Sequence, residues 1–134
     1  MAKRRRKINR YISLLRCASA QQAVENLLRQ RQSIQKFAAQ NDLVRVDEMA
    51  LAGVSARDTR REVHALIRRK LSKDDYDVLL ITDWSRLTRC GFLHAERIRH
   101  RLLAVGVRVL VAEGETAPRA EQFLPLSRCS SRVA

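Results

Sequence analysis

Apolar and polar residues follow two different periods along the first part of the chain. Residues 11–16, Tyr-Ile-Ser-Leu-Leu-Arg, form a short apolar run that predicts a strand. From residue 22 to residue 40 the apolar positions recur every three or four residues, which is typical of a helix covered on one face. Residues 43–47 alternate like a second strand, and the small and polar residues 48–58 predict a loop.

The second half of the chain continues this alternation of helices and strands. Thr59 is a candidate cap for a helix whose apolar stripe runs to Leu71. Residues 76–82 are almost continuously apolar, as in a parallel strand covered on both faces. A third helix is expected over residues 92–104 and a fourth strand over residues 107–112. This order predicts an α/β fold with an open, mostly parallel sheet of at least four strands and helices on both faces.

Polar clusters follow three of the predicted strands, over residues 16–22, 53–60 and 83–89. The carboxyl ends of parallel strands lie on one edge of a sheet, where ligands bind. This arrangement gathers the arginines at positions 16, 60, 86 and 89 at that edge. Each arginine alone is more typical of a solvated surface, but converging guanidinium groups suit the charge that develops in phosphoryl transfer.

The charge of the chain points to a polyanionic partner. There are 27 lysines and arginines against 14 aspartates and glutamates, a net charge of +13, and arginine predominates. Arginine binds phosphate with two parallel hydrogen bonds, which favours nucleic acid over a merely solubilising surface. The hydrophobic content of 46% argues against a disordered polycation.

Several other classes of protein are not indicated. The chain has no apolar run of membrane length and no signal peptide, so we expect a cytoplasmic protein without membrane contact. Cys17, Cys90 and Cys129 lack C-x-x-C spacing, which predicts free thiols rather than a zinc site or a disulfide framework. No glycine-rich nucleotide-binding loop and no metal-ligand spacing occurs, so we expect neither a cofactor nor a metal. In domain terms, we expect a basic arm over residues 1–10, one domain over 11–114, and an unstructured or truncated tail over 115–134.

Four motifs in order resemble the catalytic domain of serine site-specific recombinases, the resolvase/invertase family. Residues 14–22, Leu-Leu-Arg-Cys-Ala-Ser-Ala-Gln-Gln, resemble its Tyr-x-Arg-Val-Ser strand end with a following glutamine. Residues 30–34, Gln-Arg-Gln-Ser-Ile, match its Gln-Arg-x-x-Ile, and residues 47–60 resemble its Asp-x-x-x-Ser-Gly segment with a later arginine. Residues 83–89, Asp-Trp-Ser-Arg-Leu-Thr-Arg, match Asp-x-Ser-Arg-Leu-x-Arg in full and are the most specific of the four.

The resemblance implies a flavodoxin-like fold and a function in site-specific recombination. In this family a serine attacks a DNA phosphodiester, strands rotate within a tetramer, and the DNA is rejoined without a metal or nucleotide cofactor. The partners implied are double-stranded DNA and further copies of the chain, as a dimer or tetramer. Residues carried over to the catalytic site are Arg16, Arg60, Arg86 and Arg89. Residues carried over to substrate binding are Gln22, Gln30, Asp83 and Ser85.

The chain departs from the family pattern at the nucleophile. Ala18 occupies the position of the attacking serine, Leu14 that of the tyrosine, and Ala52 that of the serine before Gly53. Side chains alternate along a strand, so residue 18 is expected on the same side as the arginine two residues before it. Ser19, a rival nucleophile, would reach that side only if the turn began one residue earlier.

These observations leave three interpretations and leave open whether the chain is an enzyme. The first is a recombinase catalytic domain that is truncated and, because of Ala18, inactive. The second is a noncatalytic module that binds DNA or regulates a recombinase. The third, an unrelated α/β regulator, is disfavoured by four motif matches in the right order.

Overall fold

The computed structural model describes residues 9–55, 57 and 59–119 of the chain. The strands and the helices alternate in the predicted order. They are β1 (Arg10–Cys17), η1 (Ala20–Gln22), α1 (Ala23–Gln40), β2 (Val44–Ala52), α2 (Arg60–Ser72), β3 (Val78–Ile81), η3 (Trp84–Arg86), α3 (Phe92–Ala104) and β4 (Arg108–Val111).

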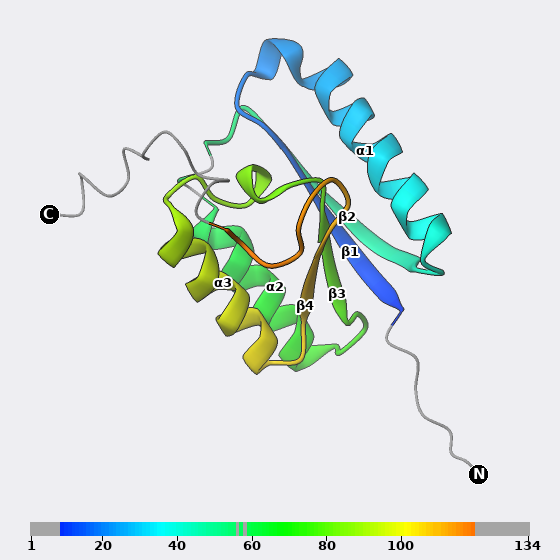
Figure 1. The fold of residues 1–134 in the computed structure, drawn as a ribbon, viewed down its shortest axis with the longest axis vertical. Helices are drawn as coiled ribbons and strands as arrows, with labels where there is room; N and C mark the ends of the chain where they lie inside the picture. Colours follow the sequence, from blue (N-terminus) through cyan, green and yellow to red (C-terminus); the bar gives the residue numbers. More distant parts are fainter. Residues whose placement is uncertain (1–8, 56, 58, 120–134) are drawn as a thin grey trace, which may run out of the picture.

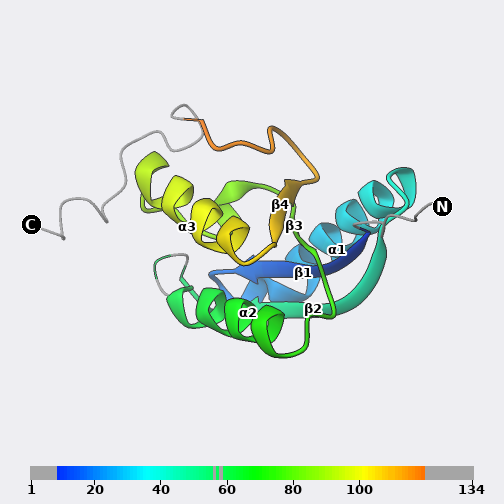
Figure 2. The same ribbon diagram turned by 90° about the horizontal axis from the view of Figure 1, so that it is seen from below.

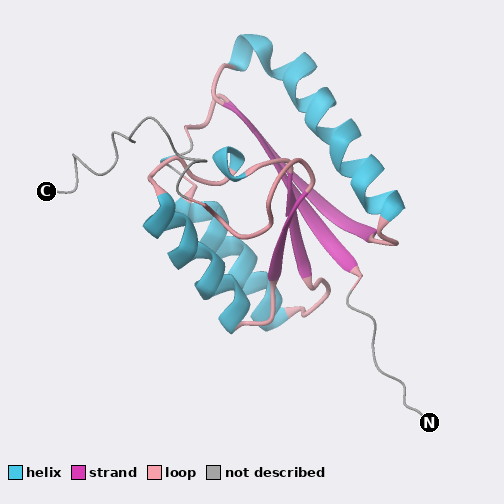
Figure 3. Ribbon diagram, viewed as in Figure 1, coloured by secondary structure: helices cyan, strands magenta, loops and turns pink. Residues whose placement is uncertain are grey.

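The four strands form one sheet in the order β2-β1-β3-β4, and every pairing is parallel (Figures 1 and 3). This is the strand order with which flavodoxin-like sheets begin. The predicted α/β fold, with an open parallel sheet of four strands, is therefore confirmed.

Helices cover both faces of the sheet, with α1 on one side and α2 and α3 on the other (Figure 2). The central strand β1 shows why. Its alternate side chains point to opposite faces, so Ile12 and Leu14 pack in the core beneath α2 and α3, whereas Tyr11 and Leu15 pack in the core beneath α1. Burial on both faces accounts for the almost uninterrupted apolar sequence of β1 and β3.

The second strand is longer than its sequence pattern indicates. β2 runs from Val44 to Ala52 and stays paired with β1 as far as Cys17, so the loop predicted over residues 48–58 begins too early. β2 is an edge strand and most of its residues are partly or fully exposed. A strand at an exposed edge does not have to alternate apolar and polar residues. The alternation used to predict the strand is therefore weak over residues 48–52. A register shift between Tyr11 and Ile12 of β1 further obscures the pattern.

The third and fourth strands are shorter than predicted, at Val78–Ile81 and Arg108–Val111. Tyr76 and Asp77 are buried but lie before β3, where the tyrosine hydroxyl donates to the carbonyl of Leu66 at 2.5 Å. Residues 1–8 of the proposed arm and 120–134 of the proposed tail lie outside the described residues. Arg10, assigned to the arm, is the first residue of β1.

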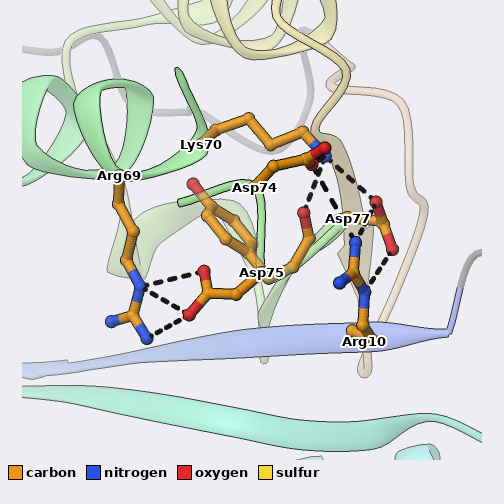
Figure 4. Close-up of polar contacts among 7 residues, drawn as sticks. Arg10, Arg69, Lys70, Asp74, Asp75 and Asp77 are labelled. Atoms are coloured by element: carbon orange, nitrogen blue, oxygen red, sulfur yellow. Dashed lines mark hydrogen bonds and ion pairs between the residues drawn. The ribbon is translucent and has the colours of Figure 1, made fainter. Parts of the chain in front are cut away.

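An ion-pair network ties the amino ends of the strands to the end of α2 (Figure 4). Arg10 donates from Nε and Nη2 to both carboxylate oxygens of Asp77, at 2.9 and 3.1 Å. Lys70 of α2 binds Asp77 at 3.0 Å and Asp74 at 2.5 Å. Arg69 binds Asp75 at 2.8 Å. This network lies at the sheet edge opposite the carboxyl ends of the strands.

Replacing Asp77 with asparagine is expected to lower the free energy of unfolding by about 2 kcal/mol at neutral pH, because the buried network loses its negative charge and one of the two acceptor oxygens. Burial raises the pKa of Asp77, but hydrogen bonds from Arg10 and Lys70 outweigh burial and leave the pKa below its ordinary value. A depressed carboxylate pKa gives stability that is present above the unfolded pKa and is lost as the pH falls through the folded one.

Urea unfolding at neutral pH and below about pH 4 measures both effects. The variant should lose less stability on acidification than the unmodified chain does. Asp42→Asn, at an exposed turn position with a positive φ of 56°, is the matched control. An acid response in Asp77→Asn equal to that of the unmodified chain would contradict the assignment.

Candidate active site

Arg16 is the centre of the site, at the carboxyl end of β1, and its side chain points inward. The residue is 2% exposed. Its guanidinium donates from Nη1 to the carbonyl of Val54 at 2.8 Å, from Nη2 to that of Ser85 at 2.9 Å, and from Nε to that of Arg86 at 3.2 Å. One side chain therefore joins β1 to the loop after β2 and to η3.

Two further arginines surround this buried cation. Arg86 donates from Nη1 to the carbonyl of Arg16 at 3.3 Å, and its Nε lies 3.6 Å from Asp83. Burial lowers the pKa of Arg16, and the positive charges of Arg89 and then Arg86 lower it further. Arg16 remains a cation at neutral pH. Arg16, Arg86 and Arg89, here called the strand-end cluster, thus concentrate positive charge, with Arg89 the exposed member.

Gln30 of α1 fixes the backbone of Arg16. Its Oε1 accepts from the Arg16 amide at 3.2 Å, and its Nε2 donates to the Arg16 carbonyl at 2.9 Å. The β1–β3 ladder extends only to Ser13, so Gln30 satisfies backbone groups that the ladder leaves unpaired. Gln30 is 4% exposed, so in this structure it acts on the protein backbone.

The two nucleophile candidates lie just beyond β1, which ends at Cys17. Ala18 and Ser19 are both exposed. Ser19 precedes η1 in an extended conformation, and its hydroxyl does not cap that helix. By alternation Arg16 shares the α2/α3 side of β1 with Ile12 and Leu14. Residue 18 would lie on the same side if the extended backbone continued past Cys17.

Asp83 and Ser85 form a local turn that shapes the other side of the site. The Asp83 carboxylate accepts from the amide of Ser85 at 3.0 Å and also from the Ser85 hydroxyl. The same carboxylate faces Arg86. The side chains assigned to substrate binding therefore position η3, whose carbonyls hold Arg16.

Arg60 and Gln22 lie apart from this cluster. Arg60 is the first residue of α2 and is exposed. Its charge acts on His94 of α3, and within the described part of the chain no hydrogen bond links it to the strand-end cluster. Gln22 is exposed where α1 begins. The order of the elements along the chain places both residues near the carboxyl edge of the sheet, but the direction of their side chains depends on the tertiary structure.

Thr59 and Val54 contribute in ways the sequence did not indicate. Thr59 precedes α2 as predicted, but its side chain makes no capping hydrogen bond. Its hydroxyl instead donates to the carbonyl of Leu87 at 2.6 Å, which fastens the start of α2 to the segment after η3. Val54 supplies a backbone carbonyl to Arg16, and a backbone group leaves no signal in the sequence.

Other expectations concern metals, membranes and thiols. Among residues 9–55, 57 and 59–119, no three or more His, Cys, Asp and Glu side chains come together as metal ligands would. No helix within those ranges is long and apolar enough to cross a membrane. Cys17 is a buried free thiol, whereas Cys90 is disulfide-bonded, so the prediction of free thiols is wrong for Cys90.

Comparisons with known proteins show the family to which the chain belongs. The family described as "Resolvase, N terminal domain" matches residues 11–126. No curated protein sequence matches the chain. Among solved structures, the C-terminal catalytic domain of ISC1926 TnpA, an IS607-like serine recombinase, is 28% identical, with a TM-score of 0.66 over 78% of this chain and 71% of that one.

Two more distant structures share the fold. The N-terminal catalytic domain of TP901-1 integrase is 18% identical, with a TM-score of 0.68 over 78% of each chain. A resolvase family site-specific recombinase from Streptococcus pneumoniae is 19% identical, with a TM-score of 0.66 over 93% of this chain and 87% of that one. The family match covers most of the chain, so this chain belongs to the resolvase N-terminal domain family, the catalytic domain of serine site-specific recombinases.

Proposed function

We propose that this domain binds the phosphodiester backbone of double-stranded DNA during site-specific recombination, and that Ala18 leaves it without the nucleophile for strand cleavage. The strand-end cluster carries the proposal. Arg16, Arg86 and Arg89 meet at the carboxyl edge of the sheet, and the alternation of side chains along β1 supports a position of residue 18 on their side. A phosphate bound there would lie among cations that the fold has already positioned.

Buried Arg16 and exposed Arg89 have different roles in this proposal. Arg16 has all three guanidinium nitrogens engaged by carbonyls, so it supplies charge from a fixed place and holds the site together. Arg89 is exposed and is free to meet a phosphate oxygen. A serine at position 18 would form a bond to phosphorus and release the DNA hydroxyl, but an alanine methyl has no lone pair for that step.

Membership of the family also supports proposals about the oligomeric state, the location and the biological role of the chain. We infer that the chain assembles as a homo-oligomer, a dimer or tetramer, on DNA in the cytoplasm. The 28% identity to the catalytic domain of an IS607-like serine recombinase supports a role on a mobile element. Five lysines and arginines precede Arg10 in residues 1–10. As a basic arm, this segment would add positive charge that attracts DNA.

A second function, a noncatalytic DNA-bound regulator of a recombinase, is favoured by one observation: Ala18 is exposed at the nucleophile position. Such a module would keep the strand-end cluster for DNA and would occupy a place in the assembly without cutting. It requires the same phosphate contacts, so the first test concerns them.

We expect weak affinity for duplex DNA, equal for unrelated sequences, that falls steeply between about 50 and 200 mM salt because bound phosphates release counterions. Fluorescence anisotropy with two duplexes of different sequence measures it. Arg89→Gln should make the slope of log K against log salt shallower by about 1.

Arg108→Gln is the matched control for this experiment. Arg108 is exposed at the amino end of β4, on the opposite edge of the sheet, and the change removes the same charge. Equal slopes for Arg89→Gln and Arg108→Gln would refute the role of the strand-end cluster. A flat response to salt, or strong preference for one duplex, would refute the proposed mode of binding.

A further inference from the structure

A second group of arginines lines a groove between the start of α2 and one face of α3. The groove has a volume of about 620 Å³. Arg57, which precedes α2, and Arg60, its first residue, line one wall, and Arg97 and Arg101 of α3 line the other. Arg97 and Arg101 are four residues apart and so lie on one face of their helix.

No carboxylate within the described residues balances these charges inside the groove. Its other lining residues are Thr59, Val63, Cys90, Leu93, His94 and Ile98. Elsewhere on the protein, arginines such as Arg10, Arg31 and Arg69 are paired with carboxylates. Cations gathered without counter-ions repel one another, and an anion in the groove would relieve this repulsion.

His94 lies where the positive charges of Arg60 and Arg97 both act. It is partly buried between the two helices, and its Nδ1 lies 2.7 Å from the hydroxyl of Thr88. Burial lowers the pKa of His94, and the positive charges of Arg97 and Arg60 lower it further. One of these arginines comes from each helix, so the field in the groove has contributions from both walls.

The groove also connects with the strand-end cluster. A neighbouring cavity of about 840 Å³ shares Arg57 and Arg60 with it and extends to Gly53 and Val54. The carbonyl of Val54 binds the buried Arg16 guanidinium at 2.8 Å. Arginines therefore line the surface from the loop after β2, past the start of α2, to α3, and they outnumber Glu62, the carboxylate that lines the neighbouring cavity.

We propose that this groove is a second phosphate-binding subsite, in which Arg97 and Arg101 hold a DNA backbone phosphate that flanks the one at the strand-end cluster. The inference rests on the proposed DNA-binding function and adds a contact on α3. A DNA strand bound at the strand-end cluster presents further phosphates along its backbone, and the wall that the two cavities share at Arg57 and Arg60 offers a path for them toward α3.

The double variant Arg97→Gln/Arg101→Gln tests the subsite in the full chain. Its slope of log K against log salt for duplex DNA should be shallower than that of the unmodified chain by about 2, one unit for each lost contact. The matched control is Arg68→Gln/Arg108→Gln, which removes the same charge from exposed arginines in the second half of α2 and at the start of β4. Thermal unfolding should show all of these proteins equally folded.

An NMR titration of His94 provides a readout that folding or net charge would not reproduce. Duplex DNA should raise the pKa of His94 in the unmodified chain, because bound phosphate offsets the repulsion from Arg97 and Arg60. In Arg97→Gln/Arg101→Gln the pKa of free His94 should already be higher, and DNA should change it little. Inorganic phosphate at the same total phosphate concentration should have a smaller effect on the unmodified chain than duplex DNA.

Three results would overturn the subsite. Equal slopes for the double variant and its control, with DNA binding otherwise intact, would reject the groove and leave the proposed function standing. An equal effect of inorganic phosphate and DNA on His94 would mark a site for free anions rather than DNA. Absence of DNA binding by the unmodified chain would instead reject the proposed function, and the groove proposal with it.

Discussion

The variant Ala18→Ser is expected to form a covalent protein–DNA adduct where the unmodified chain forms none. A hydroxyl two residues after Arg16 would face the strand-end cluster, whose charge can stabilise the phosphorane. Without a nucleophile no bond to phosphorus can form, so the adduct from Ala18→Ser should exceed the background measured with the unmodified chain by at least about 10³-fold. Because affinity for DNA is expected to be weak, the chain is fused to a zinc-finger module. It is then incubated with a nicked suicide substrate, and adducts are counted on a denaturing gel.

Ser19→Ala in the Ala18→Ser background is the control. Ser19 is exposed and makes no capping hydrogen bond, so its loss should leave the adduct unchanged. Loss of the adduct in this double variant would show that Ser19 takes part in the attack. Absence of any adduct from Ala18→Ser, while DNA binding persists, would favour the noncatalytic regulator.

The second large effect is expected from Arg16→Met, which should lower the free energy of unfolding by about 3 kcal/mol or more. Methionine fills much of the same space but cannot donate, so the carbonyls of Val54, Ser85 and Arg86 lose their partner. Arg16→Lys should recover only part of the loss, because one ammonium cannot reproduce the geometry of a planar guanidinium. Urea unfolding of both variants measures the two free energies.

Arg89→Gln serves as the comparison within the same cluster. Its exposed side chain should cost less than about 0.5 kcal/mol of stability while still weakening DNA binding. A mild effect of Arg16→Met, similar to that of Arg89→Gln, would contradict the structural role given to Arg16. The two arginines would then differ in position but not in function.

Most of the fold could be predicted from the sequence because buried positions carry apolar residues at the spacing of the helix or strand in which they lie. The apolar run of β3 and the helical spacing of α3 identify those elements, and the helix bounds of α3 agree with the prediction. β2 was predicted too short because an edge strand exposes most of its side chains. The start of β3 was predicted two residues too early because Tyr76 and Asp77, which precede the strand, are also buried.

The sequence indicated which arginines lie near the carboxyl edge of the sheet, but not where their side chains point. Strand order indicates that arginines 16, 86 and 89 approach one another, since each lies at the carboxyl edge of the sheet. Nothing in the sequence shows that Arg16 points inward to three carbonyls, because backbone acceptors carry no residue signature. The same holds for Gln30, whose amide binds the backbone of Arg16. The direction of Arg60 depends on how α2 lies against α3, which is a matter of tertiary packing.

Peptide mapping of the trapped DNA adduct tests the central claim most directly. The claim is that the domain keeps the strand-end cluster for binding phosphate and lacks the nucleophile at position 18. Mass spectrometry of proteolysed material should find the nucleotide-bearing residue at position 18 in Ala18→Ser and should find no modified peptide in the unmodified chain. A DNA-linked peptide from the unmodified chain, with the nucleotide on Ser19 or Ser85, would contradict the claim.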